Sequence, residues 1–133
     1  MSAPVAPLAP VSWGELWDKI TILRIKVSRL RSDIARTNAE RELRLLEEVA
    51  GTPAANLLPL LAALLAVNTR LWCIEDLIRE KEAAGDFGAE FVRLARSVYQ
   101  ENDERGRIKA DLNRRLNSLV VEEKQYSPYG SAP

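Results

Sequence analysis

The chain has 133 residues, of which 47% are hydrophobic and 6% are aromatic. Its 19 basic residues balance 19 acidic residues, which excludes the global electrostatic attraction expected of a general nucleic-acid or anionic-membrane binder. The chain has one cysteine and no histidine, which excludes Ser-His-Asp and Cys-His catalysis and any disulfide within the chain.

Length and residue usage predict a single cytoplasmic domain without cofactors. A chain of this length corresponds to one domain, and a lone thiol, Cys73, suits a reducing compartment. Histidine is the commonest transition-metal ligand, so its absence leads us to expect neither a metal nor a cofactor. The longest apolar run, residues 57–67, contains Pro59 and is too short to span a bilayer, so we expect no membrane insertion.

The first predicted elements are an arm and a long helix. Residues 1–11 are rich in proline and alanine and indicate an extended arm. Ser12 followed three residues later by Glu15 forms a capping box, which predicts that a helix starts there. No breaker interrupts the apolar pattern before Gly51, so we expect one helix over residues 13–50 with a coiled-coil-like seam.

Two further helices and a tail are expected. The second helix should begin near Asn56 or Pro59 and end at Gly85, and Asp86 should cap the third. The third helix continues to Leu119 in this pattern.

Residues 121–133 indicate an extended tail that Tyr126 and Tyr129 lay back along the helices. The predicted fold is therefore all-α, a three-helix bundle or long antiparallel helical hairpin over residues 12–120.

The first predicted helix has a second apolar face. Ile22 and Ile25 point away from the main seam, and Asp18 lies on their side of the helix. Because one helix with two apolar faces needs two neighbours, we expect a homo-oligomer, most simply a two-fold dimer, with Asp18, Ile22 and Ile25 at its interface. The alternative is that both faces are filled within one bundle.

Polar residues interrupt the apolar arcs of the other two helices. At 100° per residue, Asn68, Glu75 and Arg79 fall inside the apolar arc of the second helix. Glu75 and Arg79 are four residues apart and can pair. The third helix has Arg105 in the middle of its arc. Antiparallel pairing through the turn near residue 86 places Asn68 at about the level of Arg105. The candidate polar residues are Asn68, Glu75, Arg79, Asn102, Arg105 and Lys109.

Three interpretations of these residues remain open. They form a closed polar layer that fixes helix register, or an open pocket that binds an anionic small molecule through Arg79, Arg105 and Lys109. In the third, they are snorkelling side chains that only look buried on a helical wheel. No residue is assigned as catalytic, although an enzyme would use Glu75 as its base.

Three blocks of the sequence resemble a family of short, uncharacterised bacterial all-helical proteins. The blocks are GELWDKITILRIK, LWCIEDLIREKEAAGDFGAEFVRLARSVYQENDERGRIKADLN and SLVVEEKQYSPY, and the resemblance covers residues 11–129. Cys73 stands where the family pattern has an acidic residue, and Gly106 where it has alanine. The matching positions are Gly14, Glu15, Asp18, Lys19, Trp72, Glu75, Asp76, Arg79, Arg96, Tyr99, Asn102, Asp103 and Arg105.

The resemblance implies no activity that can be carried over. Such motifs also occur beside glycosyltransferase-like or tetratricopeptide-repeat proteins, which implies a link to bacterial cell-surface glycan pathways. We therefore expect a non-catalytic helical module for oligomerisation or protein interaction. The alternative is a small ligand-binding bundle, or an enzyme, that acts on an anionic small molecule at the polar pocket between the helices.

Overall fold

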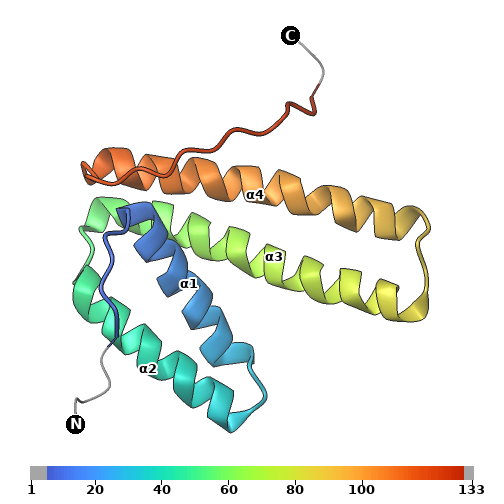
Figure 1. The fold of residues 1–133 in the computed structure, drawn as a ribbon, viewed down its shortest axis with the longest axis horizontal. Coiled ribbons are helices and arrows are strands. Elements are labelled where there is room, and N and C mark those ends of the chain that lie inside the picture. Colours follow the sequence, from blue (N-terminus) through green and yellow to red (C-terminus); the bar gives the residue numbers. More distant parts are fainter. Residues whose placement is uncertain (1–5, 131–133) are drawn as a thin grey trace.

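The protein folds into four α-helices and one short 3-10 helix in the computed structural model, which describes residues 6–130 (Figure 1). This all-α arrangement confirms the predicted class, but it has four α-helices where three were expected. In chain order the elements are α1 (Trp13–Arg29), α2 (Asp33–Ala50), η1 (Ala55–Leu57), α3 (Leu58–Ala84) and α4 (Ala89–Arg115).

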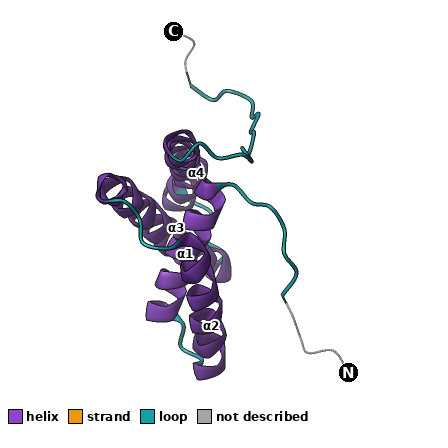
Figure 2. Ribbon diagram, turned by 90° about the vertical axis from the view of Figure 1, so that its left-hand side faces the viewer, coloured by secondary structure: helices purple, strands orange, loops and turns teal. Residues whose placement is uncertain are grey.

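The helices form two antiparallel hairpins of different length. The long α3–α4 hairpin is covered at one end by the shorter α1–α2 hairpin, and its turn end extends beyond it (Figure 1). Figure 2 shows the same arrangement along the α3–α4 hairpin, with α1 between α2 and the long hairpin. The hydrophobic core lies at the covered end, and its buried residues are Leu16, Trp17, Ile20, Leu57, Leu61, Leu64, Val67, Ile108 and Leu112.

The prediction of one long helix over residues 13–50 is wrong. The first helix ends at Arg29, the following residue Leu30 has an extended ψ of 133°, and a new helix begins after Ser32. The Ser32 hydroxyl accepts a hydrogen bond from the backbone N–H of Ala35, which is the usual contact of a helix N-cap. No glycine or proline marks this break, so only the Ser32-Asp33 pair indicates it in the sequence.

The break explains why α1 has two apolar faces. With α2 folded back beside it, α1 contacts α2 on one side and α3 and α4 on the other, all within one protomer. Asp18 and Ile25 are buried, and Ile22 is half-buried. The expectation that Asp18, Ile22 and Ile25 form an oligomer face is therefore corrected, because Asp18 and Ile25 are buried within their own chain and Ile22 borders a groove between α1, α3 and α4.

The bounds of α3 and the turn that leads into α4 lie close to the predicted positions. Pro59 lies in the first turn of α3, and Gly85 ends the helix with φ 66°, a left-handed conformation that favours glycine. Gly88 caps α4 in place of the predicted Asp86, whose carboxylate instead accepts from the Gly88 N–H at 3.2 Å. The α3 boundaries are thus close to those expected.

The C-terminal segment leaves the helix earlier than predicted. α4 ends at Arg115, and Asn117 turns the chain with φ 49° while the Ser118 N–H bonds to the Asn113 carbonyl at 2.9 Å. The segment then runs back along α4 without regular structure (Figure 1). The Tyr129 ring packs edge-on against Tyr99 of α4, with centroids 4.7 Å apart, which is the kind of contact expected of this tail.

Among the described residues, one helical stretch is long and apolar enough to cross a membrane. The stretch Ala55–Ala84 contains an 18-residue window with a mean hydropathy of 1.8, and 28% of that window is buried inside the protein. Its buried side contributes Leu61, Leu64 and Val67 to the core. On the opposite side of the first half of α3, apolar side chains such as Leu58 and Leu65 remain exposed.

Candidate functional site

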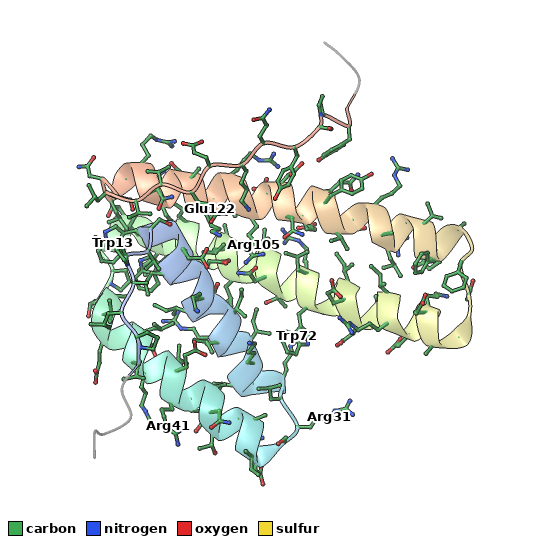
Figure 3. The ribbon with its side chains drawn as sticks, in the orientation of Figure 1. Trp13, Arg31, Arg41, Trp72, Arg105 and Glu122 are labelled. Atoms are coloured by element: carbon green, nitrogen blue, oxygen red, sulfur yellow. The ribbon has the colours of Figure 1, made fainter. Side chains whose placement is uncertain are left out.

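The centre of the candidate site is a carboxylate of α1 that lies inside the protein. The side chain of Asp18 is 1% exposed. Arg105 extends from α4 to both of its oxygens (Figure 3): Nε lies 2.9 Å from Oδ1, and Nη2 lies 2.5 Å from Oδ2. Such two-pronged pairing is among the strongest contacts between a guanidinium and a carboxylate. Asp18 therefore joins α1 to α4.

Asn68 joins α3 to the same carboxylate. Its Nδ2 donates to Asp18 Oδ1 at 3.0 Å and to Thr21 Oγ1 at 2.9 Å. The Thr21 hydroxyl donates its own proton to the Asp18 carbonyl at 2.8 Å, so towards Asn68 it acts as an acceptor. These two acceptors fix which end of the Asn68 amide is nitrogen, and Oδ1 must point the other way.

Lys109 is the second cation of the cluster. Its side chain is 8% exposed, and its Nζ lies 2.8 Å from Glu15 Oε2, 3.3 Å from Glu122 Oε2 and 3.7 Å from Asp18 Oδ2. Glu15 belongs to the first turn of α1, and Glu122 belongs to the C-terminal segment. Lys109 thus ties α4 to α1 and to the tail.

Hydrogen bonds and opposite charges keep this cluster ionised. Burial raises the pKa of Asp18, but the hydrogen bonds from Arg105 and Asn68 and the charge of Lys109 hold the pKa below its usual value. Burial lowers the pKa of Lys109, but the hydrogen bond to Glu15 and the charges of Asp18 and Glu122 raise it above its usual value. Both groups are charged at neutral pH.

These contacts form a closed polar layer within the protomer. Two cations, Arg105 and Lys109, meet three carboxylates, and no buried side-chain nitrogen or oxygen among the described residues lacks a hydrogen-bond partner. Such closure matters because an unpaired charge inside a protein costs several kcal/mol. We define the polar layer as Glu15, Asp18, Thr21, Asn68, Arg105, Lys109 and Glu122.

A close contact between backbones holds the layer in place. A Cβ added to Gly14 would lie 2.5 Å from the Lys109 carbonyl oxygen, so only glycine fits there without a shift. The Gly14 N–H donates to Asn113 Oδ1 at 2.7 Å, and the Trp13 N–H donates to Ser118 Oγ at 3.1 Å. Bonds from α4 and the following turn therefore satisfy the free amides at the start of α1.

An open groove lies beside the polar layer, between α1, α3 and α4. Its volume is about 430 Å³, within the range of small-molecule sites. Arg105 and Trp72, both labelled in Figure 3, lie in its wall. The polar and aromatic side chains that line the groove are Asn68, Trp72, Glu75, Asp76, Arg79, Asn102 and Arg105.

A second hollow of about 370 Å³ lies between α4 and the C-terminal segment. Gly106 and Ala110 form part of its wall, with Lys109 and Glu122 beside them. A Cβ added to Gly106 would meet no atom within 4 Å, so this glycine borders open space rather than another helix.

The sequence candidates divide between the layer and the groove. Asn68 and Arg105 belong to both, and Asn102 accepts from Arg105 Nη1 at 3.3 Å. Lys109 belongs to the layer and lines the hollow beneath the tail. Glu75 and Arg79 form the expected pair, with Oε2 and Nε 3.5 Å apart, but Arg79 is 80% exposed and touches no member of the layer through a hydrogen bond or ion pair.

Sequence reasoning missed several members of the site. Asp18 was placed on an oligomer face, although it is the acceptor that neutralises Arg105. Its partner Thr21 lies three residues later, and this polar spacing within an apolar helix was the available signal. Glu122 had no such signal, because the tail has no periodicity. Among the described residues, no group of three or more acidic or cysteine side chains could hold a metal ion.

Comparison with known proteins places the chain in one family. A family of unknown function (DUF6165) matches residues 9–133, which confirms the resemblance to an uncharacterised family seen in the three sequence blocks. No curated protein and no solved structure matches the chain.

Proposed function

We propose that this protein, which belongs to the DUF6165 family of unknown function, is a non-catalytic helical module that self-associates. The observation that carries the proposal is an uncharged stripe on the outside of α3. We call it the α3 outer face, and its residues are Leu58, Ala62, Leu65, Ala66, Thr69 and Cys73.

The α3 outer face has the geometry of a helix–helix seam. At 100° per residue its six members fall within an arc of about 100°, and no charged residue from 58 to 73 lies in that arc. Leu58, Ala62, Leu65 and Thr69 follow the four-three-four spacing of coiled-coil contacts. Leu58 remains 53% exposed, and Ala62, Leu65, Ala66 and Cys73 are also exposed.

A second copy of the chain is the occupant that suits this face best. No charged side chain of α3 lies on this face, and Arg29 of α1 reaches it only at its Cys73 end, with Nη1 3.6 Å from Sγ. A two-fold axis across the face would therefore pair the apolar side chains of one copy with those of the other. Its alanines allow two helix axes to approach closely. The dimer expected from the sequence would then form through α3 and not through Asp18, Ile22 and Ile25.

The polar layer supports the non-catalytic part of the proposal. Its two cations are occupied by carboxylates of the same chain. The alternative, an anionic ligand held by Arg79, Arg105 and Lys109, has weaker support, because Arg79 too is paired, with Glu75.

The proposal is tested by measuring the molar mass of the full chain in solution. Wild-type protein should sediment as a dimer at micromolar concentration, and Leu65→Glu should sediment as a monomer that keeps its helical circular dichroism. Ile34→Glu on α2 is the matched control, because Ile34 is more exposed than Leu65 but lies outside the α3 outer face. A monomeric wild type, or a dimer that survives Leu65→Glu, would contradict the proposal.

A further inference from the structure

We propose that the groove between α1, α3 and α4 binds an uncharged polyhydroxylated ring, of the size and chemistry of a pyranose sugar. The proposal is independent of self-association. It rests on two amide groups whose orientation the polar layer fixes, on an indole beside them, and on charges that are already balanced.

The first amide presents an acceptor to the groove. Asn68 is a buried residue whose Nδ2 is committed to Asp18 and Thr21. Its Oδ1 receives no hydrogen bond from the described residues. Since no buried side-chain oxygen among them lacks a partner, Oδ1 must be accessible, and Asn68 lines the groove. The oxygen is thus held in place before a ligand arrives.

The second amide presents a donor. Asn102 Oδ1 accepts from Arg105 Nη1, and Arg105 is itself fixed by its two bonds to Asp18. Asn102 Nδ2 has no acceptor among the described residues and remains able to donate. A fixed acceptor beside a fixed donor suits a ligand with neighbouring hydroxyls, because each hydroxyl both donates and accepts.

The rest of the wall suits the apolar side of a sugar ring. Trp72 is half-buried and lines the groove, while Ile22, Leu71 and Val98 supply apolar surface. A pyranose has C–H groups on one face and hydroxyls at its rim, so it can pack on the indole while its hydroxyls reach the amides. The groove is open along one side, and its volume of about 430 Å³ accommodates a ring of this size.

The charges of the groove favour a neutral ligand over an anion or a nucleotide. Arg79 and Arg105 are balanced by Glu75 and Asp76 in the same wall, and Asp18 behind the wall holds Arg105. A phosphate or carboxylate would therefore approach two carboxylates and find no unpaired cation. The hydroxyls of a neutral ring can instead donate to Glu75 and Asp76.

The experiment is saturation-transfer NMR on the full-length protein with a panel of single-ring probes. The uncharged probes are methyl glucoside, methyl galactoside, methyl mannoside and N-acetylglucosamine, and the competing chemistries are glucuronate and uridine. We expect at least one uncharged sugar to bind at millimolar concentration, with tighter binding than glucuronate or uridine. Failure of every uncharged sugar to bind, or tighter binding of either competitor, would overturn the proposal.

Variants locate the binding. Trp72→Ala and Asn102→Ala should each weaken the affinity about tenfold or more, while both proteins unfold cooperatively on heating. Asn102 also lines the hollow beneath the tail, whereas Trp72 does not, so Trp72→Ala is the variant that separates the groove from that hollow. Gly106→Leu fills the other hollow, beneath the tail, and should leave the affinity unchanged. Unchanged binding in both groove variants, or an equal loss in Gly106→Leu, would place the ligand elsewhere and refute the assignment.

Discussion

At the end of the α3–α4 hairpin that α1 covers, Arg105 and Lys109 are held by carboxylates from α1 and from the tail. At the turn end, Arg93 pairs with Glu90 on its own helix, and both side chains are about half exposed or more. Surface pairs of the second kind stabilise a protein little, because water screens them. The covered pairs join α4 to α1 and to the tail, so they fix how these segments are arranged.

The two ends also differ in how they treat apolar side chains. The covered end buries a core from α1, η1, α3 and α4. Near the turn, Leu77, Phe87 and Val92 stay exposed, because two helices alone cannot enclose them. The fold is therefore specified at one end by a core and polar layer, and the long hairpin extends from that end.

The largest difference in stability between the two kinds of ion pair should appear when the Asp18 carboxylate is removed. Asp18→Ala leaves Arg105 and Lys109 without a buried partner, and we expect a loss of about 3 kcal/mol in the free energy of unfolding, the low end for a broken buried pair because Arg105 is 27% exposed. Urea denaturation measures this loss. Glu90→Gln at the turn end is the control and should unfold like the wild type.

The glycines distinguish close packing from open space. Gly14→Ala places a methyl group against the Lys109 carbonyl and should destabilise the protein by about 2 kcal/mol. Gly106→Ala adds the same methyl group where no atom lies within 4 Å, and the better helix propensity should stabilise the protein by up to about 1 kcal/mol. Equal effects of the two substitutions on the thermal midpoint would mean that α1 does not approach α4 closely.

The effect of pH should follow the depressed pKa of Asp18. A carboxyl with a lower pKa in the folded than in the unfolded protein adds stability above its ordinary pKa, near 4, and this stability is lost as the pH falls through the folded pKa. The free energy of unfolding should therefore fall below about pH 4. Measured at several acidic pH values, the fall should be smaller in Asp18→Ala than in wild type. Identical acid profiles would show that Asp18 is not held ionised by its partners.

The sequence predicted the long hairpin better than the covered end. The bounds of α3 follow from helical periodicity and from the turn at Gly85. Counting residues back and forward from that turn also places Asn68 opposite Arg105. Local signals of this kind are visible in a single sequence. No glycine or proline stands at the break near Leu30, so a prediction from apolar periodicity continued the first helix through it.

Because the helix break was missed, the predicted surroundings of Asp18 were also wrong. On a continuous helix its side appeared to need a partner outside the protomer, whereas the folded α1–α2 hairpin leaves it facing Asn68 and Arg105. The contact of Glu122 with Lys109 is also tertiary, and a tail without periodicity gives no register from which to infer it.

A double-mutant cycle on Asp18 and Arg105 tests most directly whether the polar layer holds the helices together. The free energies of unfolding of Asp18→Ala, Arg105→Ala and the double variant are measured by urea denaturation against wild type. Because each single variant removes the two bonds between these side chains and leaves the other charge without its main partner, we expect the double variant to lose at least about 1.5 kcal/mol less than the sum of the two single losses. Losses that add to within about 0.5 kcal/mol would contradict a direct interaction between the two side chains.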